Sequence, residues 1–136
     1  MAKNLNTVKL KTSPRRGYHH GDLQAALIAA AADVLEEKGV SGFSLREAAR
    51  RAGVSPGAPA HHFGNSQGLL TAVAAEGFKQ LTETLIEAEN TSEKDQHLER
   101  MGAAYIEFAR ERPALFSIMW ARELLDIENP TYLAAG

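Results

Sequence analysis

Residues 44–63 read SLREAARRAGVSPGAPAHHF, and this stretch decides the fold. Ser44 is a residue type that caps helices, and Glu47, three positions later, completes the pattern of a capping box. Apolar residues then recur at helical spacing as far as Gly53, which can end a helix in the left-handed backbone conformation. A serine–proline pair at 55 and 56 predicts that a second helix starts almost at once. We therefore expect two short helices joined by a tight turn.

Small residues line the expected contact between these two helices. Ala48, Ala49, Ala52 and Gly53 let the helices approach closely at a steep angle, as in a helix-turn-helix. In that motif the second helix enters the major groove of DNA. The stretch therefore predicts a DNA-reading element.

Several motifs of the chain resemble the DNA-binding domain of the tetracycline-repressor (TetR) family of bacterial transcription regulators. They are Phe43-Ser-Leu-Arg-Glu-Ala-Ala, Ala52-Gly-Val-Ser, Gly57 and His62-Phe63, with Tyr18-His-His-Gly-Asp-Leu before them and Asn65-Ser-Gln-Gly-Leu-Leu after them. Spaced motifs over so much of the chain carry more weight than a single short match. The resemblance implies an all-α fold and a complete form that is a homodimer. It also implies a transcriptional repressor that a small-molecule ligand releases from double-stranded DNA.

The resemblance also assigns candidate DNA-binding residues. Ser44 and Arg46 lie where the first helix of the motif meets the DNA backbone, and His62 occupies a position that the family uses against phosphate. The exposed front of the reading helix is formed by Ser55, Pro56, Gly57, Ala58, Ala60 and His61.

The chain departs from the family pattern at two phosphate-binding positions. Ala60 stands where a tyrosine is usual, and Ser66 stands where a lysine is usual at the start of the following helix. Both departures should weaken sequence-independent affinity and flatten its salt dependence. Ser66 can still cap that helix, whose free amides and positive dipole end can hold a phosphate.

The reading front offers few side chains that can form hydrogen bonds with bases. Two prolines stiffen it, and Ala58 and Ala60 suit contacts with thymine methyl groups. Ser55 and His61 are the polar exceptions. We expect specificity to depend on DNA shape and on the N-terminal arm.

The N-terminal side of the motif divides into an arm and a helix. Residues 1–17 are polar and basic, which predicts a flexible arm that can follow phosphate or enter the minor groove, although a plain unstructured leader is an equal alternative. A helix is expected from Asp22 to Lys38, because its apolar residues form one stripe and Gly39 supplies the stop. Together with the helix-turn-helix it predicts a DNA-binding domain over residues 18–65.

The C-terminal side continues with helical patterns and shows no strand pattern. We expect helices over 66–89 and 95–112, and a further helix from Pro113 to the Asn129-Pro130 pair, which should end it. These residues, 66–136, predict a helical ligand-binding and dimerisation domain that is incomplete relative to the family.

Six large side chains of this C-terminal part are candidates for the ligand pocket that the resemblance implies. They are Met101, Tyr105, Phe108, Phe116, Met119 and Trp120. Each of them taken singly is more simply a core residue, so only their clustering favours a pocket.

Charge and composition agree with this division of the chain. Residues 1–68 carry nine Lys or Arg and five Asp or Glu, whereas residues 69–136 carry six and twelve. A basic front and an acidic back suit a protein whose N-terminal half meets phosphate, although such an imbalance is also ordinary for a protein surface. The chain has no cysteine, no secretory pattern and no apolar run long enough to span a membrane, which predicts a cytoplasmic protein.

Two other classes of protein are considered. A helical protein-interaction module that has lost DNA binding is the alternative, because Ala60 and Ser66 replace phosphate-binding residues. An enzyme is not expected, since the chain has no cysteine nucleophile and no glycine-rich phosphate loop, and its five histidines form no metal-binding pair on a helix face. We expect no cofactor and no metal.

Overall fold

The structure is a computed structural model that describes residues 20–136, and over this range it is helical without a strand. The helices are α1 (His20–Lys38), α2 (Leu45–Ala52), α3 (Ala58–Phe63), α4 (Ser66–Asn90), α5 (His97–Glu111), α6 (Pro113–Trp120) and α7 (Pro130–Ala135). Short 3-10 turns lie at η1 (Val40–Gly42), η2 (Lys94–Gln96) and η3 (Arg122–Leu124). The all-α prediction is confirmed. The predicted arm at residues 1–17 lies outside the described residues.

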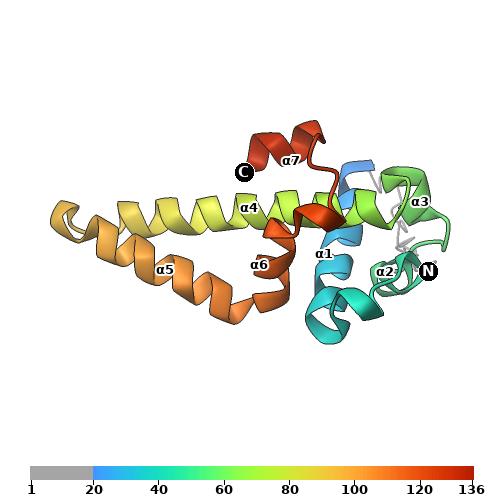
Figure 1. The fold of residues 1–136 in the computed structure, drawn as a ribbon, viewed down its shortest axis with the longest axis horizontal. Helices are drawn as coiled ribbons and strands as arrows, with labels where there is room; N and C mark the ends of the chain where they lie inside the picture. The colour runs from blue at the N-terminus through green and yellow to red at the C-terminus, as the bar shows by residue number, and fades with distance from the viewer. Residues whose placement is uncertain (1–19) are drawn as a thin grey trace, which may run out of the picture.

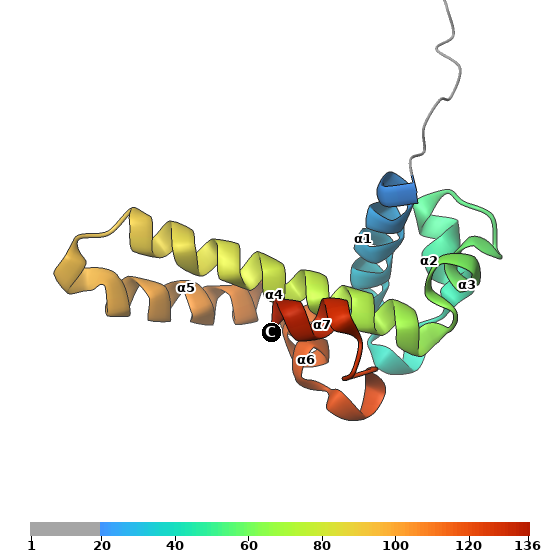
Figure 2. The ribbon, with the colours of Figure 1, turned by 90° about the horizontal axis from the view of Figure 1, so that it is seen from above.

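The long helix α4 is the axis of the molecule, and its 25 residues span about 38 Å. α1, α2 and α3 gather at its N-terminal end, and α5 runs back beside its C-terminal half (Figure 1). Figure 1 shows α6 and α7 on opposite sides of α4, and Figure 2 shows the molecule from above, with α7 in front of α4. Below, α1–α3 are called the head and the α4–α5 pair is called the arm. This arm is a different segment from the N-terminal arm predicted at residues 1–17.

The core lies where the head meets α4. The predicted apolar stripe of α1 is confirmed, since Leu27, Ala31, Val34 and Leu35 are almost fully buried. The buried surface of α4 is broad and includes Leu69, Thr71, Ala75 and Phe78. The reason is that α1 and α6 pack on one side of α4 while α7 packs on another.

The prediction for the last helix was wrong. α6 ends at Trp120, where Ala121 leaves the helical conformation, and Asn129-Pro130 begins α7 instead of ending α6. The Asn129 side chain accepts hydrogen bonds from the N–H groups of Thr131 at 3.0 Å and Tyr132 at 3.3 Å. An asparagine followed by proline is therefore acting as an N-cap with proline at the first helical position.

Only part of the apolar side of α5 is covered. Leu98 is 87% exposed, and Tyr105 is 38% exposed. The side that packs on α4 instead carries Met101, Ala104 and Phe108, which are half-buried or buried. Leu98 and Tyr105 are each one position away from that register and so lie at its outer edge.

Candidate nucleic-acid interface

The caps of α2 set the first half of the helix-turn-helix. As predicted, the Ser44 hydroxyl accepts the Glu47 N–H, at 3.1 Å. At the other end Gly53 has a φ of 69°, and the N–H of Val54 donates to the carbonyl of Ala49 at 3.1 Å. These bonds satisfy backbone groups that the helix ends leave free. The α2 helix is therefore fixed in length by its own sequence.

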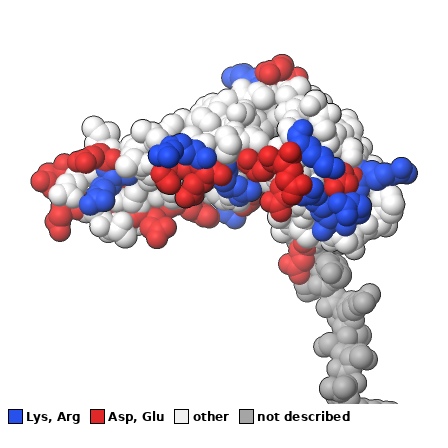
Figure 3. Space-filling model, turned by 90° about the horizontal axis from the view of Figure 1, so that it is seen from below, with Lys and Arg blue, Asp and Glu red and all other residues white. Residues whose placement is uncertain are grey.

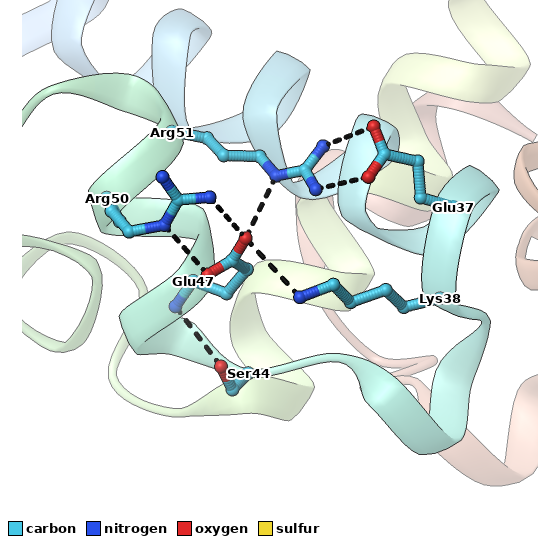
Figure 4. A network of polar contacts seen from close by, with 6 residues as sticks. All are labelled: Glu37, Lys38, Ser44, Glu47, Arg50 and Arg51. Carbon is cyan, nitrogen blue, oxygen red and sulfur yellow. Dashed lines mark hydrogen bonds and ion pairs between the residues drawn. The ribbon is translucent and has the colours of Figure 1, made fainter.

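The Glu47 side chain departs from the predicted capping box because it binds cations instead of the Ser44 backbone (Figure 4). Its carboxylate accepts hydrogen bonds from Arg50 at 2.7 and 3.0 Å and from Arg51 at 3.2 Å. The Lys38 ammonium lies 3.5 Å from the same carboxylate. The hydrogen bonds from Arg50 and Arg51 lower the pKa of Glu47 to about 2.

Arg51 joins this network to α1. Its guanidinium forms a two-pronged ion pair with Glu37, which raises the pKa of Arg51 and lowers the pKa of Glu37. The side chain of Arg51 is only 19% exposed. Arg51 is therefore a bond between α1 and α2, and its charge is compensated inside the head.

Arg46 is the α2 arginine that stays uncompensated. It is exposed, and it forms no ion pair with the residues that the structure describes. Ser44, two positions earlier, is also exposed. The two side chains are thus accessible at the N-terminal turn of α2, where the family resemblance places contacts with the DNA backbone.

The start of α3 differs from the prediction. Ser55 and Pro56 do not begin the helix, because the carbonyl of Ser55 accepts the N–H of Ala58 at 3.1 Å in a tight turn. Gly57, with φ −84° and ψ −13°, has the conformation of the third residue of a type I turn and serves as the N-cap of α3. Pro59 falls in the first helical turn, where a missing N–H costs little, and it is buried.

The predicted reading front is nonetheless accessible. Ser55, Pro56, Gly57, Ala60 and His61 are exposed and Ala58 is half-buried. His62 is half-buried, and its ring meets the His61 ring edge-on at 5.1 Å. The candidate residues of α2 and α3 therefore lie at the head end of the molecule, opposite the turn that joins α4 to α5 (Figure 1).

The cap of α4 was assigned to the wrong residue. Asn65, not Ser66, is the N-cap, and its side chain accepts the N–H of Gly68 at 2.9 Å. Asparagine is among the strongest N-cap residues, so the sequence carried this signal one position earlier. A Cβ at Gly68 would lie 1.9 Å from the carbonyl oxygen of Phe63, so this glycine permits the close turn from α3 to α4. Ser66 is the exposed first residue of α4.

The balance of charge differs between the head and the arm. On the face drawn in Figure 3, a group of Lys and Arg side chains lies at the head end beside several Asp and Glu side chains, and both kinds of charge occur along the arm. Over the described residues the arm carries the larger excess of Asp and Glu. A polyanion would therefore meet the head more favourably than the arm.

The six candidate ligand residues do not share one environment. Phe108 and Met119 are buried, Met101 and Phe116 are half-buried, Tyr105 is 38% exposed and Trp120 is 54% exposed. Three of them belong to a row of edge-on aromatic rings that runs Tyr105, Phe116, Trp120, Phe78 and Tyr132, with ring centroids 5.4, 6.3, 5.0 and 5.8 Å apart. Phe78 and Tyr132 were missed because they lie on α4 and α7. A groove of about 1000 Å³ lies between α1, α3, α4 and α7 and is lined by none of the six.

The described residues show neither a membrane-spanning helix nor a metal-binding cluster. No helix in this part is long and apolar enough to cross a membrane. Residues 20–136 also hold no cluster of three or more side chains suited to bind a metal ion.

The chain is similar to known regulators. Residues 27–73 match the family described as "Bacterial regulatory proteins, tetR family". The chain is 45% identical over 62 residues to the HTH-type transcriptional regulator CymR of Pseudomonas putida, covering 46% of this chain and 30% of that protein. It is 26% identical over 104 residues to the uncharacterized HTH-type transcriptional regulator YobS of Bacillus subtilis, covering 76% and 52%. The chain thus spans about half or less of the length of both regulators.

Solved structures share its fold. A protein of unknown function from Rhodococcus sp. RHA1 superposes with a TM-score of 0.74 at 37% identity, over 89% of this chain and 63% of that chain. A TetR family transcription regulator from Marinobacter aquaeolei VT8 superposes with a TM-score of 0.62 at 18% identity, over 85% and 65%. At such low identity the second likeness concerns the fold alone.

Proposed function

Because the chain belongs to the tetR family of bacterial regulatory proteins, as its motifs predicted, we propose that it is a transcription regulator that binds double-stranded DNA with its head. We further propose that it acts in the cytoplasm, as a homodimer in its complete form and as a repressor released by a small molecule. The observation that carries the proposal is Arg46. It is an exposed arginine without an ion pair in the described part, on the helix that precedes an accessible reading front.

The proposed contacts divide between phosphates and bases. Ser44 and Arg46 bind the DNA backbone from the first turn of α2, and the exposed start of α4 at Ser66 holds a phosphate with its backbone amides. His62 contacts a further phosphate. In the major groove, Ser55 and His61 form the polar contacts, and Pro56, Gly57, Ala58 and Ala60 form the apolar ones.

The proposed effector site uses the aromatic row of α5 and α6. The rings of Tyr105 and Trp120 are exposed, and Phe116 is half-buried between them. Met101 lies about one helical turn before Tyr105 on α5. Such a surface suits a small apolar or aromatic molecule. Phe108 and Met119 support the site from the core. Trp120 is the single tryptophan of the chain, so its emission offers a direct readout of effector binding.

Selection of bound fragments from random and genomic DNA tests DNA binding, followed by a salt titration on the best fragment. An enriched palindrome with a steep salt dependence supports a dimeric regulator, and an enriched half-site supports a working head without pairing. No enrichment by a chain shown to be folded contradicts the proposal and favours the helical protein-interaction module. That alternative is suggested by the apolar, exposed Ala60 on the reading front.

A matched pair of variants localises the binding. Arg46→Ala should weaken binding to all sequences and reduce the salt slope by about 1, because one phosphate contact is lost. Arg100→Ala removes the same charge from the exposed surface of the arm and should change neither quantity. Equal effects of the two variants would mean that net charge, and not the head, determines binding.

A further inference from the structure

The last turn of α1 carries three consecutive charged residues that bind in two directions. The carboxylate of Glu36 accepts the N–H of Leu115 at 2.8 Å and the N–H of Ala114 at 3.3 Å, both on α6. Glu37 and Lys38 instead reach α2. Neighbouring helix positions are turned by about 100° from one another, which lets one turn face two partners.

The contact with Glu36 completes the N-terminus of α6. Pro113 has no N–H, the next two N–H groups are those of Ala114 and Leu115, and the one after them donates to the carbonyl of Arg112 at 2.9 Å. Arg112, the N-cap residue, supplies no side-chain cap. A carboxylate is favoured at this positive end of a helix. The cap of α6 therefore comes from α1, almost eighty residues earlier in the chain.

The contacts of Glu37 and Lys38 fix α2 to the same turn. Glu37 holds Arg51 in a two-pronged ion pair, and the Lys38 ammonium lies 3.5 Å from the Glu47 carboxylate (Figure 4). α6 is thus joined to α2 through one turn of α1, by a path that does not pass through α4.

We propose that Glu36 is a positioning residue that couples α6 to the DNA-reading head, so that the position of α6 sets the position of α2 on DNA. The proposal rests on the proposed function and concerns its regulation. Coupling between two sites is reciprocal, so DNA bound at the head must also change the state of α6. Trp120 ends α6 and packs edge-on against Phe78 at 5.0 Å, and its emission therefore reports that state.

The experiment titrates the selected DNA fragment into four chains: wild type, Glu36→Ala, Glu36→Gln and Asp33→Ala. Asp33 is an exposed acid on α1 that has no bond to α6, so its variant is matched in charge. Anisotropy of labelled DNA measures binding, and Trp120 emission measures the response of α6, with N-acetyltryptophanamide as the control for absorption by DNA. Circular dichroism establishes that each variant is folded.

Wild type and Asp33→Ala should show an emission change that saturates with DNA. Glu36→Ala should still bind DNA, but its emission change should fall to less than about a third of the wild-type value, because the two hydrogen bonds that tie the start of α6 to α1 are lost. Glu36→Gln keeps a carbonyl acceptor and should recover much of the change. A full emission change in Glu36→Ala overturns the proposal.

If none of the four chains binds DNA, the proposed function is refuted but the coupling is not. Amide hydrogen exchange measured without DNA then tests the coupling by itself. Glu36→Ala should speed exchange at the Leu115 amide and also in α2, by roughly tenfold at both places, because one turn holds both helices. Faster exchange at α6 with α2 unchanged would mean that Glu36 is only a helix cap, and the coupling would be refuted.

Discussion

The turn between α3 and α4 can be tested with a glycine, because Gly68 lies against the chain it follows. An added Cβ at this position would be 1.9 Å from the carbonyl oxygen and 3.0 Å from the carbonyl carbon of Phe63. Both atoms belong to the backbone and cannot move away by changing a rotamer. Gly68→Ala therefore forces α3 and α4 apart by about 1 Å or more if ordinary contact distances are to be restored.

The size of the effect follows from opposing terms. Alanine favours a helix over glycine by about 0.8–1 kcal/mol. Against this, overpacking costs about 1–3 kcal/mol, and loss of the Asn65 cap, which binds the Gly68 N–H, costs about 1 kcal/mol more. The variant should therefore be destabilised by roughly 1–3 kcal/mol, and its α3 helix should be displaced.

Gly102→Ala is the matched control, because Gly102 is also helical and a Cβ there meets no atom within 4 Å. It should gain about 0.5–1 kcal/mol. In thermal unfolding the two variants should melt roughly 10 °C apart, with wild type between them. DNA affinity should fall only for Gly68→Ala. A Gly68→Ala variant that melts at or above the wild-type temperature would refute the described turn.

Three further predictions concern single side chains. Thr71→Val should lower the free energy of unfolding by about 1–3 kcal/mol, because the buried hydroxyl accepts the Asp126 N–H at 2.9 Å; an unchanged urea midpoint would contradict this. Ala60→Tyr should tighten DNA binding at moderate salt by roughly fivefold through a new phosphate contact, and equal or weaker binding would count against the docking. The pKa of Glu47 is lowered to about 2, so its ion pairs stabilise the fold above the unfolded pKa of about 4.5 and this contribution is lost as pH falls toward 2. Urea midpoints of wild type and Glu47→Gln should therefore converge from pH 5 to 2, and parallel curves would show that the network adds no stability.

Local signals in the sequence were sufficient to predict features that depend only on neighbouring residues, such as helix caps and apolar stripes. The Ser44 cap, the left-handed Gly53 and the apolar stripe of α1 were all predicted, because each depends on residues within one or two turns. The Asn129-Pro130 pair shows the limit of this reasoning. Proline disfavours a preceding helix and favours a following one, and only the packing of α7 on α4 decides between the two.

Two kinds of contact could not be predicted: those in which several groups compete for one side chain, and those between distant segments. Glu47 looked like half of a capping box, but Arg50, Arg51 and Lys38 compete for its carboxylate, and charged donors outweigh a single backbone N–H. Glu36 gave no local signal at all, since its partners lie on α6. Likewise, the ligand candidates were chosen by residue type, and the structure distributes them between the core and an aromatic row.

For the proposed DNA binding, the distribution of charge in the head favours recognition of DNA shape over base contacts. Arg51 is compensated by Glu37 and Glu47, and Arg50 is bound to the same Glu47, so Arg46 is the α2 arginine left for the DNA backbone. On the reading front only Ser55 and His61 are polar, and neither has the two-pronged geometry that gives arginine or asparagine about 1–3 kcal/mol of discrimination per base. Discrimination by a head of this kind must come from how well a sequence deforms to meet it. Under this proposal, the bonds that position α2 and α3, Arg51 with Glu37 in the head and Asn65 with Gly68 at the start of α4, are as important for specificity as the side chains proposed to contact the bases.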